Sequence, residues 1–315
     1  MNFKLLTICF FLCAVCYSAD ISAPKMEIID TPDGRTTVFS QGITIIDKDN
    51  QITGKYAVFY ERGNFARITD SVRIINPQMN ISADTAIYYF DNKWSNLKGN
   101  VQVESDTLKI ETSDLIFEQS KNIIKTNTYI TIREKKQNLT IVGYVAEYNF
   151  TEGTGVIESL PVLYIERKDT TVIRSAKMVL NNRESQFFAI ESVTAKTGNT
   201  ILKCDTLLFF TMEDSGIALG NPRIFDKESW INGTIIKFYF GNSDSAGESD
   251  NQNELRTVKI IESANTHYIT QDGGILEVSG NLFAINYLNG DIEYIRIFSD
   301  SLNIISGTFT PKEEL

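Results

Sequence analysis

The sequence has few of the residues that build disulfides, metal sites and nucleophilic active sites. Of its 315 residues four are Cys and one is His, and three of those Cys lie within the first 18 residues. Beyond them Cys204 stands alone, so no internal disulfide can form. His267 has no second His or Cys close by, and zinc-type ligand spacing is therefore missing. We predict no metal site and no cofactor.

Motifs for catalysis are missing as well. The sequence contains no P-loop, no dinucleotide fingerprint and no nucleophile-elbow pattern, and Gly153-Thr154-Gly155 lies in a turn between strands. Asp and Glu are frequent, but they occupy turns and polar positions, where a solvated face explains them. We therefore predict that the protein is not an enzyme and has no catalytic residue.

Only one long apolar run occurs, over residues 5–15, and Lys4 is the single charge before it. A run of this length with small residues after it is typical of a signal peptide, and it is short for a transmembrane helix. We expect residues 1–18 to be removed on export. Lipidation at Cys13 or Cys16 and retention as an uncleaved anchor remain alternatives.

Positive charge is scarce relative to negative charge. The chain has 30 Lys and Arg against 40 Asp and Glu, for a net charge of −10. An acidic protein repels nucleic acids and anionic surfaces. We therefore expect no nucleic-acid partner.

No long amphipathic helix is predicted after residue 18; one β-rich phrase recurs instead. It begins at Ile52, Ile81, Ile110, Ile141, Ile173, Leu202, Ile231 and Val278, with a truncated copy at Ile304. The first seven starts lie 29, 29, 31, 32, 29 and 29 residues apart. Such a period indicates one supersecondary unit stacked on its own copies.

Each copy is predicted to be a strand, a turn and a return strand. In the second copy these are residues 81–90, 91–93 and 97–103, and the repeats are rich in Ile, Val, Tyr, Phe and Thr. We predict an all-β fold, an antiparallel array of eight or nine strand–turn–strand units. Residues 19–315 are expected to form this single array, interrupted by a polar loop over residues 241–257.

The apolar pattern changes phase within each copy. Counting the first residue as zero, the apolar positions are zero and then five and seven, while position two is small, as at Ala83 and Cys204. Because side chains alternate with period two, this change requires a bulge or corner near positions three and four. Each strand is thus predicted to bend, and Cys204 to be a small buried residue. A stack of bent strands makes a trough or a flattened tube, either open inside or packed solid.

The residues at positions five and seven are predicted to face one continuous interior. The larger of them are the candidate lining residues: Phe59, Tyr88, Leu115, Phe117, Tyr148, Met178, Leu180, Leu207, Phe209, Ile236, Phe238, Phe283 and Ile285.

The second copy resembles the repeat of the LptA/OstA family of lipopolysaccharide transport proteins. The resemblance rests on Ala83-Asp84, Ala86, Tyr88 and then Gly99-Asn100-Val101; the copy from residue 202 keeps Cys204-Asp205 and Gly220-Asn221 but has Pro222 for the Val. Other copies keep only the hydrophobic spacing.

The resemblance implies a periplasmic β-jellyroll, a taco-like pair of sheets that holds the acyl chains of lipopolysaccharide. It also implies end-to-end strand addition to LptC-like and LptD-like proteins, with self-association as an alternative. The chain could correspond to an LptA-like bridge, an LptC-like anchor or the N-terminal part of LptD. Uncharged stretches at residues 36–46 and 302–306 are the expected edges. The alternative function is an exported β-solenoid, either structural or adhesive, or a β-helix protein that acts on polysaccharide.

Overall fold

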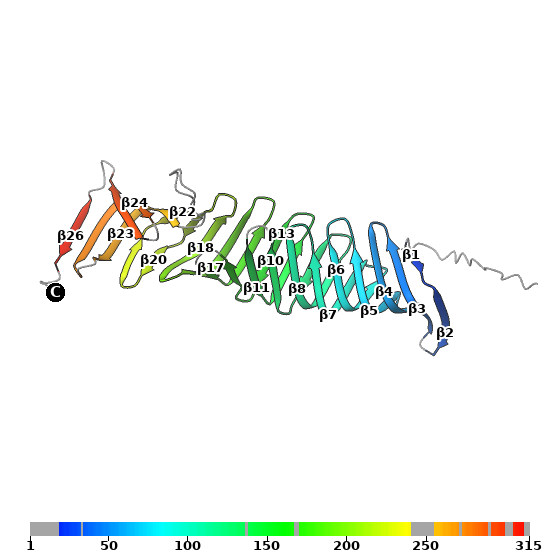
Figure 1. Cartoon of the computed structure of the whole chain (residues 1–315). Coiled ribbons are helices and arrows are strands. Elements are labelled where there is room, and N and C mark those ends of the chain that lie inside the picture. The colour runs from blue at the N-terminus through cyan, green and yellow to red at the C-terminus, as the bar shows by residue number, and fades with distance from the viewer. Residues whose placement is uncertain are drawn as a thin grey trace, which may run out of the picture.

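The computed structural model describes residues 19–32, 34–135, 138–166, 170–240, 255–270, 273–288, 291–299 and 305–311. These residues form strands and turns and no helix (Figure 1). The predicted all-β class is confirmed. Among the described residues there is also no helix of the length and apolarity needed to span a bilayer.

The strands follow one another along an elongated array. In chain order they are β1 Ala19–Ser22, β2 Lys25–Thr31, β3 Gly34–Asp47, β4 Asn50–Tyr60, β5 Phe65–Ile75, β6 Asn80–Tyr89, β7 Trp94–Glu104, β8 Leu108–Glu118, β9 Ile123–Thr126, β10 Ile130–Glu134, β11 Leu139–Gly143, β12 Val145–Asn149 and β13 Thr154–Glu158. They continue as β14 Val162–Ile165, β15 Thr171–Arg174, β16 Lys177–Asn181, β17 Gln186–Thr197, β18 Thr200–Phe210, β19 Ser215–Leu219, β20 Arg223–Asp226, β21 Ser229–Asn232, β22 Ile235–Phe240, β23 Leu255–Ile269, β24 Ile275–Leu288, β25 Asp291–Phe298 and β26 Ser306–Thr310.

All pairings among these strands are antiparallel. From β3 to β8 each strand pairs with the next through a hairpin. Further along, a bent strand is divided into two short ones, so that β9 and β10 both pair with β8. A parallel β-helix is therefore excluded for the described chain.

The polar loop predicted over residues 241–257 lies mostly outside the described residues, but its last three residues belong to β23.

The two ends of the array are built alike. At the N-terminal end β1 and β2 pair with the two halves of β3, and at the C-terminal end β25 and β26 pair with the two halves of β24. The predicted N-terminal edge at residues 36–46 is wrong, because these residues lie in β3 and are paired on both sides. β1 and β2 belong to no repeat copy. Together they form one more bent strand, which pairs with β3 and covers the predicted edge.

The bend predicted within each copy is present. In β6 the buried residues are Ile81 and Ala83 and then Ala86 and Tyr88, so the buried face changes parity after Ala83. In three copies the first strand is interrupted near this point, between β11 and β12, β15 and β16, and β21 and β22. Folding at the bends brings the two halves of the meander face to face. The core lies between these two layers.

Candidate functional site

The return strands also bend, through a backbone feature that the sequence pattern did not reveal. At the bend, the return strands carry two consecutive residues with positive φ, at Gln41-Gly42, Asp70-Ser71, Gly99-Asn100, Ser159-Leu160, Glu191-Ser192, Gly220-Asn221 and Glu262-Ser263. In the pairing of β17 with β18, Ile190 lies opposite Thr206 and Val193 lies opposite Cys204. Two residues of β17 therefore lie opposite a single residue of β18, which is a β-bulge. An added pair in the left-handed region sharpens the local turn of the strand. Most of these residues are not Gly, so composition offered little signal for the pair.

The resemblance motif is explained by contact at this bend. Asn100 Nδ2 donates a 2.9 Å hydrogen bond to Asp84 Oδ2 across β6 and β7. Gly99 has a φ of 76°, and a Cβ built on it would lie 2.3 Å from Asp84 Oδ2. Asp205 and Gly220 meet in the same way, with Asp205 N donating to Gly220 O at 3.1 Å. The Asp and the Gly-Asn step are therefore parts of one corner, formed by neighbouring strands.

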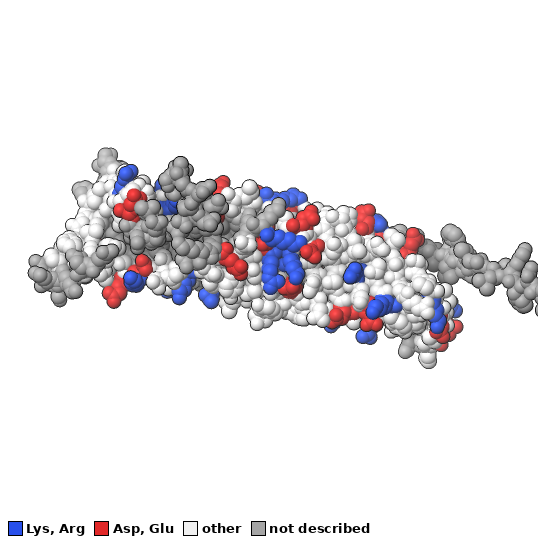
Figure 2. Space-filling view, in the orientation of Figure 1, with Lys and Arg blue, Asp and Glu red and all other residues white. Residues whose placement is uncertain are grey.

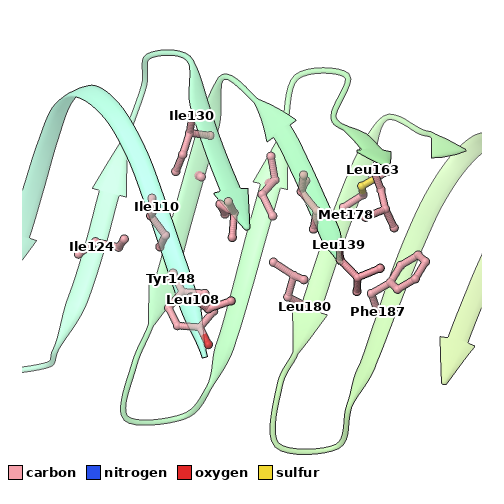
Figure 3. Packing of buried hydrophobic residues seen from close by; sticks show 14 of the residues in the cluster. Leu108, Ile110, Ile124, Ile130, Leu139, Tyr148, Leu163, Met178, Leu180 and Phe187 are labelled. Carbon is pink, nitrogen blue, oxygen red and sulfur yellow. The ribbon is translucent and has the colours of Figure 1, made fainter. Parts of the chain in front are cut away.

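The predicted lining residues all lie on the inner face. Phe59 and Phe238 are half-buried and pack against the core; the other eleven are buried: Tyr88, Leu115, Phe117, Tyr148, Met178, Leu180, Leu207, Phe209, Ile236, Phe283 and Ile285. Figure 3 shows Leu108, Ile110, Tyr148, Leu180 and Phe187 spread along the interior on successive strands. Cys204 is buried as predicted, and burial raises the pKa of its thiol to about 12. The thiol is thus protonated and unreactive at neutral pH.

The N-terminal part of the interior is filled. Ile68, Tyr88, Leu97, Leu115 and Phe117 have no solvent exposure. Rings pack edge to face, as between Tyr88 and Phe90 with centroids 4.8 Å apart. Because these side chains are closed off from solvent, this part of the interior forms a solid core.

The C-terminal part of the interior contains an apolar cleft. Its lining is aliphatic and aromatic apart from three threonines: Ile165, Thr171, Ile173, Ala195, Thr197, Thr200, Leu202, Leu207, Phe209, Ile224, Phe238, Phe240, Leu255 and Val258. Its free volume is about 90 Å³. This is less than the ~150 Å³ of an apolar cavity that holds one benzene molecule. A larger apolar guest would require the two layers to separate.

The two layers are joined by the bends on one side and meet at their hairpin turns on the other. We call this second line the seam. Near the N-terminal end it is closed by hydrogen bonds: Lys93 Nζ donates to Asp47 Oδ1 at 2.8 Å, and Asn76 Nδ2 donates to Asn122 Oδ1 at 3.2 Å. Further along, turn residues of both layers, including Thr107 and Met212, line a pocket of about 260 Å³. Near the N-terminal end the seam is therefore bridged by polar groups that surround a polar pocket of about 290 Å³, and further on it is hollowed by a pocket with a more apolar lining.

Comparison with known proteins supports one family. Residues 6–157 match the family described as lipopolysaccharide-assembly, LptC-related. A solved structure similar to this chain is LptH of Pseudomonas aeruginosa, described as the LptA-homologous periplasmic component of the lipopolysaccharide transport device. That similarity covers 56% of this chain and 91% of LptH, at 8% identity and a TM-score of 0.23. No curated protein matches the chain. The resemblance to lipopolysaccharide transport proteins, inferred from the repeat, is confirmed by the family match.

Proposed function

Because residues 6–157 of this chain match the LptC-related lipopolysaccharide-assembly family, we propose that the protein is a non-enzymatic component of lipopolysaccharide transport in the periplasm. It binds the acyl chains between its two layers and forms part of the route from the inner to the outer membrane. The observation that carries this proposal is the apolar interior between the two layers, whose buried residues extend from Phe39 to Ile285.

The energetics favour hydrocarbon as the interior guest. Removing one methylene from water contributes about 0.8 kcal/mol, and the cleft from Ile165 to Val258 is lined almost wholly by apolar side chains. The free volume of about 90 Å³ is too small for an acyl chain. Binding therefore includes separation of the layers along the seam, where hairpin turns meet instead of a continuous sheet.

The ends of the array suit the proposed partners. β25 and β26 at one end, which pair with β24, and β1 and β2 at the other, which pair with β3, each have one edge that pairs with no described strand. Such edges can pair with another chain. We propose head-to-tail strand addition to other proteins of the same transport route, or to a second copy.

Site-specific photo-crosslinking tests the lipid proposal. A photoreactive residue at Leu115, Tyr148 or Leu207 should capture lipopolysaccharide in cells. Matched positions on the outer face of the same strands, Glu111 in β8 and Lys203 in β18, should not. We expect the strongest capture at Leu207, which lines the cleft and needs the smallest movement of the layers. Equal capture on both faces, or none on the inner face, would overturn the proposal.

A further inference from the structure

Opposite charges pair across neighbouring strands at several points on the outer face of the array. Lys residues lie directly opposite acidic residues on neighbouring strands, as Lys98 does opposite Asp114 and Lys177 opposite Glu158, with salt bridges of 3.4 and 3.1 Å. Figure 2 shows basic and acidic side chains close together near the middle of the array. Between β8 and β10, Arg133 lies opposite Lys109, and Glu111 forms salt bridges with both.

On the outer face of β22–β25 three cations share one row without a described acidic partner. Lys237 of β22 lies directly opposite Lys259 of β23. In the same row Lys259 lies opposite Ala284 of β24, and Ala284 lies opposite Arg296 of β25. None of the salt bridges among the described residues involves these three cations. Like charges directly opposite each other destabilise a sheet. In a chain with a net charge of −10, this row is a local concentration of positive charge that an anion would stabilise.

The row borders a hollow in the outer face of the sheet. The hollow has a volume of about 550 Å³ and is lined by Tyr239, Thr257, Lys259, Leu282, Ala284, Asn286, Tyr294, Arg296 and Phe298. This volume lies in the range of small-molecule sites, about 300–1,000 Å³. The register explains the concavity, because Ala284 is a small residue between Lys259 and Arg296.

Aromatic rings hold both cations in place. Lys259 Nζ lies 5.6 Å from the ring centroid of Tyr239, and the Arg296 guanidinium lies 4.7 Å from that of Tyr294. Such contacts are favourable and restrict the positions of the charged groups. Tyr239 and Phe298 remain exposed, by 38% and 48%. The site therefore combines fixed cations, accessible ring faces and a polar group in which Thr257 Oγ1 donates a 3.4 Å hydrogen bond to Asn286 Oδ1 and Asn286 Nδ2 donates to the Tyr294 hydroxyl. Each of the two side chains keeps further hydrogen-bonding capacity.

We infer that this outer face of β22–β25, named here the cationic hollow, binds an anionic saccharide, with a phosphate group on Lys259 and Arg296. Arg and Lys pair with phosphate through charge-assisted hydrogen bonds. The apolar faces of a sugar ring pack on the aromatic rings, and its hydroxyl groups reach Thr257 and Asn286. This site lies on the face opposite the acyl-chain interior, so the inference goes beyond the proposed function and stands or falls separately from it.

The test is a titration of the purified mature protein with glucose 6-phosphate, glucose and inorganic phosphate, followed by nuclear magnetic resonance at low salt. Glucose 6-phosphate should shift the resonances of β22–β25 and bind more tightly than either other probe. The Lys259→Gln/Arg296→Gln variant should weaken that binding at least tenfold.

A matched control is available in the other layer. Lys203 lies opposite Arg223, again without a salt bridge to a described residue, but both stack on Phe225. The Lys203→Gln/Arg223→Gln variant removes the same charge and should keep glucose 6-phosphate binding at β22–β25. Equal loss in both variants would show nonspecific attraction and overturn the inference. So would glucose 6-phosphate binding no tighter than inorganic phosphate.

Discussion

The Tyr88 hydroxyl donates a 2.6 Å hydrogen bond to Asp47 Oδ2 and thereby links two residues 41 positions apart in the chain. Asp47 is 3% exposed and also accepts a hydrogen bond from Lys93. The two donors come from β6 and the turn after it, and Asp47 comes from the end of β3. This group of three, the clasp, bridges the N-terminal part of the seam through a buried carboxylate that accepts two hydrogen bonds.

Loss of one donor should destabilise the fold. Tyr88→Phe keeps the ring but leaves Asp47 Oδ2 buried without its partner, which costs about 1–3 kcal/mol in the free energy of unfolding. Urea denaturation followed by circular dichroism measures this. Asp30→Asn is the control, because the salt bridge between Asp30 and Arg35 is exposed, and it should leave the midpoint unchanged. A Tyr88→Phe midpoint equal to that of the wild type would show that the clasp contributes nothing.

The corner at Gly99 should tolerate no side chain. Gly99→Ala combines a left-handed backbone with a Cβ placed 2.3 Å from Asp84 Oδ2. Gly198 has a similar φ of 56°, but nothing lies within 4 Å of a Cβ built there. Gly198→Ala should cost about 1–2 kcal/mol from the backbone alone, and Gly99→Ala should cost clearly more. Thermal unfolding of both variants measures the difference; equal losses would mean that the corner adjusts without strain.

Stability should fall at alkaline pH. Burial raises the pKa of the Cys204 thiol from 9.0 to about 12 and that of the Tyr148 hydroxyl from 10.0 to about 12. The unfolded chain therefore loses these protons first, and the stability they contribute is complete below pH 9 and lost as pH rises toward 12. We expect the free energy of unfolding to decline over this range.

A variant with Tyr148→Phe and Cys204→Ala should show a shallower decline between pH 9 and 11 in urea titrations. Tyr144→Phe, at a tyrosine that is 56% exposed, is the control and should follow the wild-type slope. If the double variant declines as steeply as the wild type, the alkaline loss originates elsewhere.

The C-terminal edge should mediate association. Deleting residues 301–315 removes β26 and leaves one half of β24 without its outer neighbour. If strand addition occurs here, the truncated protein should lose self-association or binding to its partner in sedimentation experiments, while the far-ultraviolet spectrum of the remaining strands persists. Unchanged association would show that β26 is not the junction and would leave the edge of β1 and β2 as the site of strand addition.

Much of the fold could be read from local pattern. The recurrence of a phrase about every 29 residues predicted the hairpins, and β6 and β7 begin and end within three residues of their expected bounds. The change in phase between Ala83 and Ala86 predicted the bend and the inner face. Both follow from the alternation of side chains along one strand, which is a property of consecutive residues.

Pairing between distant residues was decided by the tertiary structure alone. Asp47 lies in no predicted lining set, yet it meets Tyr88 because folding at the bends brings different hairpin turns together. The opposition of Lys237 and Lys259 depends on the register of β22 and β23, on the two sides of an insertion that breaks the repeat period. The sequence alone determined which face of each strand is buried. Only the folded array decided which charges face each other and where the interior is filled, because both depend on contacts between residues that are far apart in the chain.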